Sequence, residues 1–219
     1  HQHRPGYLLL AVDVAAAQIP MPDIQPAAPI NQDTAVATAF AAAAERLLAP
    51  AQRVALLADF LASRWQLQSP LADLRQLRAI PAATLLMGKG VLDEHQPGYV
   101  GTYAAEGSSD AVRRAIEETD VTLCVGVRFT DTLTAGFTQQ LPADRVIDLQ
   151  PFHATVGGER FAPLSMAQAL AALLPIYQRH CAHWALADTV FCEEIEQNDD
   201  AVISQRAFWQ AMQRFLQPG

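Results

Sequence analysis

Basic clusters and long apolar runs are both missing from this 219-residue sequence. Lys and Arg together number 15 against 23 Asp and Glu, which gives a formal net charge of −8. Nucleic-acid binding needs a concentrated basic footprint, and a membrane span needs about 20 consecutive apolar residues. We therefore expect no nucleic-acid partner and no membrane partner.

Cysteine is scarce, with Cys124, Cys181 and Cys192 as the three in the chain. Their odd number and the lack of C-x-x-C spacing argue against a disulfide framework. We therefore expect the protein in the cytoplasm, where thiols stay reduced. The first residues also lack a secretory cleavage pattern. Because there is no initiator Met, we expect a segment of a longer protein.

The common phosphate and nucleophile motifs are absent. Gly88-Lys89-Gly90 lacks the third glycine of a dinucleotide fingerprint, and a glycine stands where a P-loop needs Ser or Thr. A tight turn after a strand is the favoured interpretation, and backbone amides approaching a ligand are the alternative. No G-x-S-x-G elbow occurs, and Ser108 and Ser109 are interpreted as helix caps.

A metal site is not predicted. His180 and His183 flank Cys181, but two ligands without a third fall short of the four that structural zinc requires. Surface histidines are the favoured interpretation of this pair.

What is present is a large hydrophobic fraction, 51%, arranged as alternating strands and helices. Short continuous apolar runs, typical of strands covered on both faces, predict strands at 53–59, 83–90, 121–127 and 145–151. Capped or amphipathic segments predict helices at 33–49, 69–80, 108–119 and 165–179. This order predicts an α/β fold: a Rossmann-like open parallel sheet with helices on both faces.

The two ends of the chain differ from this pattern. Residues 7–14 predict a short strand, followed by a proline-rich extended linker. After a polar connection, residues 204–219 predict a helix whose apolar face needs a cover. That face holds Phe208, Trp209, Met212, Phe215 and Leu216.

Two loops are candidates for function. Residues 126–138, "GVRFTDTLTAGFT", follow a predicted strand directly, and open α/β sheets bind ligands at the carboxyl ends of their strands. Residues 93–107 form a Gly- and Tyr-containing loop. For this second loop, binding and structural interpretations are both open.

Residues 85–138, which include "LLMGKG", "GTY" and "RFTDTLTAGFT", resemble the central domain of thiamine-diphosphate-dependent 2-oxo acid decarboxylases. The similarity is closest to the indolepyruvate (aryl pyruvate) decarboxylases. It implies a six-stranded parallel sheet. It also implies three parts: the end of an upstream pyrimidine-binding domain with a linker at 1–32, the central domain at 33–180, and a linker with the start of a diphosphate-binding domain at 181–219.

The resemblance implies a parent enzyme that converts indole-3-pyruvate or phenylpyruvate to the aldehyde and carbon dioxide. Such a parent uses thiamine diphosphate and Mg²⁺, held by the flanking domains of a homodimer or homotetramer. The catalytic glutamate, the paired histidines and the Mg²⁺ motif of the family belong to those domains, so no catalytic, cofactor or metal residue is assigned here. The segment alone is expected to be inactive.

Substrate-binding residues are expected in the first loop, at Phe129, Asp131 and Thr132. The family position matching Thr132 lines the substrate pocket, and a small side chain there leaves room for an aryl group. The alternative is that the threonines only satisfy the loop backbone. One departure is that residues 56–65 contain no Cys, whereas fungal pyruvate decarboxylases carry a regulatory cysteine at about Phe60.

Two other functions stay open. Related central domains bind FAD or an adenosine diphosphate, which makes a nucleotide-binding module the main alternative. An independent NAD-dependent enzyme is the third, although the sequence has neither its fingerprint nor a catalytic dyad.

Overall fold

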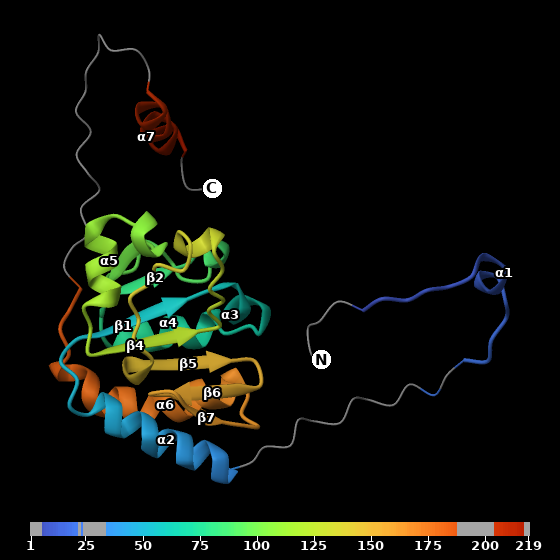
Figure 1. Ribbon diagram of the computed structural model, residues 1–219, viewed down its shortest axis with the longest axis horizontal. Helices are drawn as coiled ribbons and strands as arrows, with labels where there is room; N and C mark the ends of the chain where they lie inside the picture. The colour runs from blue at the N-terminus through green and yellow to red at the C-terminus, as the bar shows by residue number, and fades with distance from the viewer. Residues whose placement is uncertain (1–5, 22, 24–33, 188–203, 217–219) are drawn as a thin grey trace.

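A seven-stranded sheet forms the centre of the computed structural model, which describes residues 6–21, 23, 34–187 and 204–216 (Figure 1). The strand order is β3-β2-β1-β4-β5-β6-β7. The strands are β1 (Val54–Ala58), β2 (Ala82–Thr84), β3 (Tyr99–Thr102), β4 (Val121–Val125), β5 (Val146–Gln150), β6 (His153–Val156) and β7 (Glu159–Phe161). From β3 to β5 the neighbours are parallel, which confirms the predicted α/β sheet.

The far edge of the sheet differs from the prediction of six parallel strands. β5 pairs with β6, and β6 with β7, in antiparallel register. The connections there are too short for a crossover helix, so each strand must turn back beside its neighbour. Gly157 and Gly158, both with positive φ (57° and 86°), make the two-residue turn between β6 and β7.

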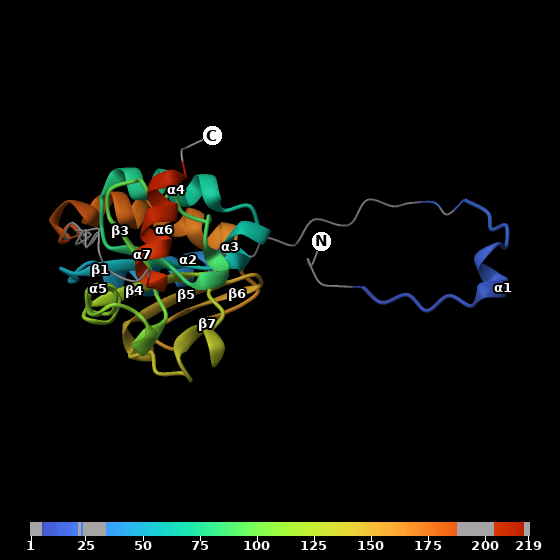
Figure 2. The same ribbon diagram turned by 90° about the horizontal axis from the view of Figure 1, so that it is seen from above.

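Helices cover both faces, as predicted. On one face lie α2 (Thr34–Leu48), α4 (Gln68–Leu77) and α6 (Met166–His180), and on the other lies α5 (Asp110–Glu117). Figure 2 shows α4 and α6 on one side of the sheet and α5 on the opposite side. The caps follow from sequence: the Ser109 hydroxyl accepts from the Val112 amide, and Ser165 with Gln168 forms a capping box.

The core has two layers because successive residues of a buried strand point to opposite faces. In β1, Val54, Leu56 and Ala58 join the larger cluster under α2, α4 and α6. Ala55 and Leu57 join the smaller cluster under α5. All five residues are buried, which confirms the interpretation of this apolar run as a strand covered on both faces.

Several predicted boundaries are wrong. Residues 7–14 do not form a strand; the described part pairs this segment with no other strand, and a lone strand has no ladder to stabilise it. Instead α1 (Val12–Ala15) is a single exposed helical turn. The strand predicted at 83–90 ends at Thr84, and η1 (Leu86–Gly88) follows as a 3₁₀ turn.

The helix predicted at 69–80 begins at Gln68 with Leu67, not Ser69, at the N-cap position. Ser108 is not a helix cap either, since its hydroxyl accepts from the Ala104 amide at 2.7 Å. Near the C-terminus, α7 (Gln205–Phe215) is confirmed with Ser204 as its cap. Its predicted apolar face is exposed in the described structure, including Phe208, Trp209, Phe215 and Leu216.

Candidate functional site at the carboxyl edge of the sheet

The topological switch point of the sheet lies between β1 and β4. From β1 the chain moves outward through β2 to β3, and from β4 it moves the other way to β5. Open α/β sheets bind ligands in the crevice at such a point. The connections that leave from this edge include α3 (Phe60–Arg64), η1, and the loop that follows β4, which we define as the switch loop, residues 126–141.

The crevice is filled by the chain itself. A Cβ added to Gly126 would lie 2.4 Å from the Ala62 backbone nitrogen, and one added to Gly88 would lie 2.6 Å from the Asp59 Cα. These glycines therefore let two segments of backbone meet, and they leave no space for a pyrophosphate. Gly90, with a φ of +85°, completes a turn, which supports the tight-turn interpretation of Gly88-Lys89-Gly90.

Asp59 sits at the end of β1 in the middle of this packing and is fully buried. Its Oδ2 accepts a hydrogen bond from the Arg128 amide at 3.1 Å. Its Oδ1 is buried and has no hydrogen-bond partner among the described residues. Burial raises the pKa of this carboxyl, and the backbone amides of Phe60 and Arg128 partly oppose that shift.

Threonines organise the interior of the switch loop. The Thr134 hydroxyl donates to the Thr130 carbonyl at 2.7 Å, and the Thr138 hydroxyl donates to the Thr134 carbonyl at 2.9 Å. The Glu106 amide donates to the Thr138 hydroxyl at 3.2 Å and ties the loop to the segment after β3. For these three threonines, the interpretation as backbone partners fits the structure.

Of the three predicted site residues, two are exposed and one packs against the core. Asp131 and Thr132 are exposed and adjacent, and Asp131 Oδ1 accepts from the Thr132 amide at 2.7 Å and from its hydroxyl at 3.3 Å. This contact begins η3 (Thr132–Thr134). Phe129 is half-buried and packs against the smaller core cluster, so its ring supports the loop from below.

Phe137 is an exposed aromatic residue that the sequence analysis did not single out. It is 59% exposed and follows Ala135 and Gly136, and all three have positive φ. A left-handed conformation is rare for a non-glycine residue. The only sequence signal for it was the neighbouring Gly136.

Glu117, at the end of α5, holds the far end of the switch loop. Its Oε1 accepts from the Tyr103 hydroxyl at 2.6 Å and from the Gln140 amide at 3.1 Å. Tyr103 is fully buried, and burial, followed by the contact with Glu117, raises the pKa of its hydroxyl. No signal in the sequence marked Glu117, because it lies in an amphipathic helix where a charged residue is ordinary.

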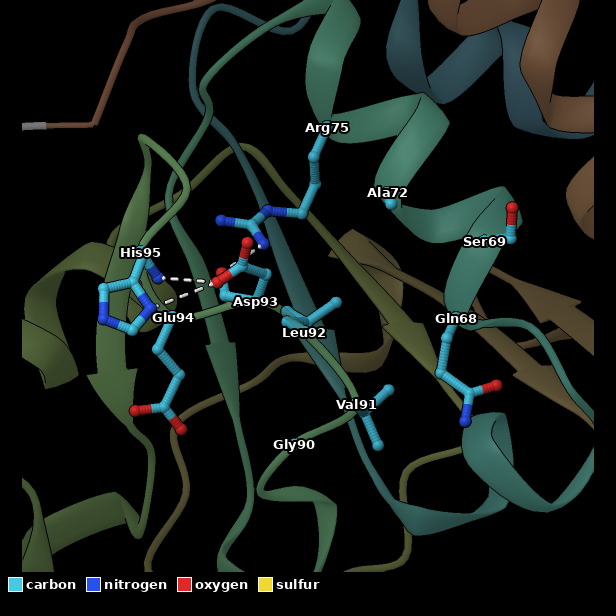
Figure 3. Close-up of a pocket in the computed structure, with 10 residues that line it drawn as sticks. All are labelled: Gln68, Ser69, Ala72, Arg75, Gly90, Val91, Leu92, Asp93, Glu94 and His95. Atoms are coloured by element: carbon cyan, nitrogen blue, oxygen red, sulfur yellow. Dashed lines mark hydrogen bonds and ion pairs between the residues drawn. The ribbon is translucent and has the colours of Figure 1, made fainter. Parts of the chain in front are cut away.

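A second concavity lies between α4 and the segment after η1 (Figure 3). It has a volume of about 540 Å³ and is lined by Gln68, Ser69, Ala72, Arg75, Gly90, Val91, Leu92, Asp93, Glu94 and His95. The buried Arg75 guanidinium donates to the carbonyls of Asp93, Gln96 and Pro97 at 2.9, 3.2 and 3.3 Å. Its Nη1 and Nη2 are thus engaged, whereas its Nε is buried and has no hydrogen-bond partner among the described residues. The two carboxylates in the lining, Asp93 and Glu94, make the pocket a poor match for a phosphate group. In the 93–107 loop, these contacts favour the structural interpretation.

The remaining candidates have ordinary surroundings. His180 Nε2 lies 3.2 Å from Glu45 Oε1, and the ring of His183 packs edge-on against His180. Within the described ranges, no group of three His, Cys, Asp or Glu side chains could hold a metal ion.

Cys124 is buried, which raises the pKa of its thiol, whereas Cys192 lies outside the described residues. In the part of the chain that is described, no helix combines the length and the apolar character needed to cross a membrane.

Comparison with known proteins decides the family. Residues 41–175 match the family model described as "Thiamine pyrophosphate enzyme, central domain". The chain belongs to this family. The match begins within α2 and ends within α6, and it includes all seven strands and the whole switch loop.

Individual relatives of this central domain are decarboxylases. It is 39% identical over 178 residues to the "Alpha-keto-acid decarboxylase" of Mycobacterium avium (strain 104), covering 81% of this chain and 32% of that protein. It is also 39% identical to the proteins of the same name from Mycobacterium leprae (strain TN), over 181 residues, and Mycobacterium tuberculosis (strain ATCC 25618 / H37Rv), over 180. Each of these two matches covers 80% of this chain and 31% of the relative. The chain thus spans about a third of the length of these relatives.

Proposed function

We propose that this central domain is part of a thiamine-diphosphate-dependent 2-oxo acid decarboxylase that acts on aryl substrates. The parent enzyme would convert indole-3-pyruvate to indole-3-acetaldehyde and carbon dioxide, with phenylpyruvate as a second substrate. Family membership and the decarboxylase relatives support the reaction class. The observation that carries the substrate class is the small, exposed Thr132 on an ordered loop at the carboxyl edge.

The domain itself would support chemistry that occurs elsewhere. When bound, thiamine diphosphate supplies the carbanion stabilisation that decarboxylation needs. The switch-point crevice is packed with backbone around Asp59, Gly88 and Gly126, so it does not fit the diphosphate of that cofactor. We therefore assign thiamine diphosphate and Mg²⁺ to flanking domains, of which residues 1–32 and 181–219 would be the adjoining parts. The parent would be a cytoplasmic homodimer or homotetramer.

The switch loop would form one wall of the substrate pocket. Thr132 would face the aryl group, because a short side chain leaves volume that a bulky one would fill. Asp131 would set the position of Thr132 through its bonds to the Thr132 amide and hydroxyl. Phe129 would complete the substrate-binding segment by supporting it from the core side.

Substitution of Thr132 tests this assignment in the full-length protein with its flanking domains. For Thr132→Trp we expect kcat/KM for indole-3-pyruvate to fall by about tenfold or more, while the value for pyruvate changes by less than about threefold. Thr38→Trp, at an exposed position of α2, is the matched control. Equal losses on both substrates, or no loss at all, would remove Thr132 from the pocket.

A nucleotide-binding module remains the alternative function. The filled crevice and the two carboxylates beside Arg75, Asp93 and Glu94, weigh against it. Titration of the chain with ADP, together with a visible absorption scan for flavin, tests it directly. Stoichiometric binding of either ligand would replace the proposal above.

A further inference from the structure

The switch loop is held at both ends by carboxylates from other parts of the fold. At its beginning, the Arg128 amide donates to Asp59, and at its far end the Gln140 amide donates to Glu117. Asp59 directly follows β1 and Glu117 is the last residue of α5, so the two anchors come from different parts of the fold. Thr132 lies on the segment between the two anchored amides.

The Asp59 anchor cannot turn away from the loop. The residue is fully buried, and Gly88 packs directly against its backbone and its Oδ1. A buried carboxylate with a partnerless oxygen is costly compared with a neutral side chain. Such a cost is expected where a position serves function and not stability alone, and the contact that this carboxylate provides to the loop is the bond to Arg128.

The Glu117 anchor is itself oriented by the core. Tyr103, which donates to it, is fully buried, and its own amide donates to the Thr84 carbonyl at 2.8 Å. The Glu117 carboxylate is therefore fixed by the end of β2 through one intermediate side chain. Charge-assisted bonds of this kind are stronger than bonds between neutral groups.

Between the anchors, side chains of the loop fix it further. The Thr138 hydroxyl accepts a hydrogen bond from the Glu106 amide, and the Asp131 carboxylate accepts one from the Thr132 amide. A binding residue held by such a supporting shell keeps its position to a fraction of an ångström. Misplacement of about 1 Å costs activity even when the contact residue is unchanged.

We infer that Asp59 and Glu117 are positioning residues that hold Thr132 at the distance an aryl 2-oxo acid requires. This inference rests on the proposed function, because it assigns the two carboxylates to the same substrate pocket. They touch neither substrate nor cofactor in this assignment. They act through the backbone amides of Arg128 and Gln140.

The test uses the full-length protein and the Glu117 end, where a half-buried site tolerates change. Glu117→Ala removes the acceptor, Glu117→Gln keeps an oxygen at that position, and Glu118→Ala, next to it and exposed, is the matched control. Tyr103→Phe removes the orienting hydroxyl but leaves the Gln140 contact. Asp59→Asn probes the other end, since it keeps one oxygen for Arg128.

The first readout is amide hydrogen exchange, which does not depend on activity. We expect exchange at Gln140 to quicken by about tenfold or more in Glu117→Ala, the factor that follows from losing a hydrogen bond to a charged group. In Glu118→Ala the rate should stay within about threefold of the unaltered protein. In Glu117→Gln, which keeps an acceptor oxygen but not its charge, the rate should lie between those of Glu118→Ala and Glu117→Ala. Unchanged exchange in Glu117→Ala overturns the anchor.

The second readout is the ratio of KM for indole-3-pyruvate to KM for pyruvate. We expect Glu117→Ala to raise this ratio by about fivefold or more, and Glu117→Gln to restore most of it. Faster exchange with an unchanged KM ratio would overturn the role of Glu117 in specificity. It would not bear on the proposed decarboxylase function, which the Thr132→Trp variant tests separately. If the unaltered protein releases no carbon dioxide from any keto acid, the proposed function and the specificity role both fall, while the exchange result still decides the anchor.

Discussion

Gly126 lies so close to Ala62 that a Cβ on the glycine would come within 2.4 Å of the Ala62 backbone nitrogen. The first turn after β1 is thereby pressed against the residue that follows β4. This contact closes the crevice where an open α/β sheet most often accepts a ligand. It also fixes the origin of the switch loop, because Gly126 is the first residue of that loop.

Substitution of Gly126 should therefore be severe. Gly126→Ala combines a backbone clash with a left-handed φ of +63°. We expect the free energy of unfolding to fall by about 2 kcal/mol or more, measured by urea denaturation. Gly90→Ala is the control, since that glycine has a similar φ of +85° but open space around it. It should cost only about 1 kcal/mol; equal losses would show that the close approach to Ala62 contributes nothing.

The Arg75 guanidinium should matter for stability more than an ordinary surface arginine. Arg75→Met keeps most of the apolar stem but removes donors from the carbonyls of Asp93, Gln96 and Pro97. We expect a loss of about 2 kcal/mol in unfolding free energy, because three hydrogen bonds from a buried, charged guanidinium are removed. The exposed Arg46→Met on α2 should stay within about 0.5 kcal/mol of the unaltered chain. A loss no larger than that of the control would contradict a structural role for Arg75.

Asp148, on β5, should make stability depend on pH. Burial raises the pKa of its carboxyl to about 6, although the Gln150 amide, 2.9 and 3.1 Å from its two oxygens, opposes the shift. An acid whose pKa is higher in the folded state binds its proton more tightly there. Its contribution to stability is therefore complete below about pH 4, the unfolded value, and is lost as the pH rises through about 6.

Replacement of Asp148 by Asn should flatten that profile. Between pH 4 and 7, the free energy of unfolding should fall less in Asp148→Asn than in the unaltered chain. The difference between the two falls should be at most about 3 kcal/mol. Asp144→Asn, at an exposed site before β5, removes the same charge without the burial. If both variants follow the unaltered profile, Asp148 is not the group responsible.

The elements that the sequence predicted well are those with a strong local pattern. β1 and β4 are continuous apolar runs, and α6 begins at a Ser165 capping box. β3, β6 and β7 were missed because they are three or four residues long and only partly buried. Nothing in such short segments separates a strand from a loop until a neighbouring strand pairs with it.

The site divides in the same way. The position of the switch loop could be predicted, because a polar segment directly after a buried strand must emerge at the carboxyl edge. The anchors could not, since Asp59 lies 69 residues from Arg128 and Glu117 lies 23 residues from Gln140. Phe129 was grouped with Thr132 by proximity in sequence, whereas its ring packs inward.

By itself, the sequence determined the class of fold, the placement of the switch loop and the resemblance to the thiamine pyrophosphate enzymes, because each depends on residues close together in the chain. Only the tertiary structure decided that the crevice is filled, that two carboxylates hold the loop and that the last two strands reverse direction. Those features depend on atoms brought together from distant segments, and which segments meet is set by packing of the whole domain.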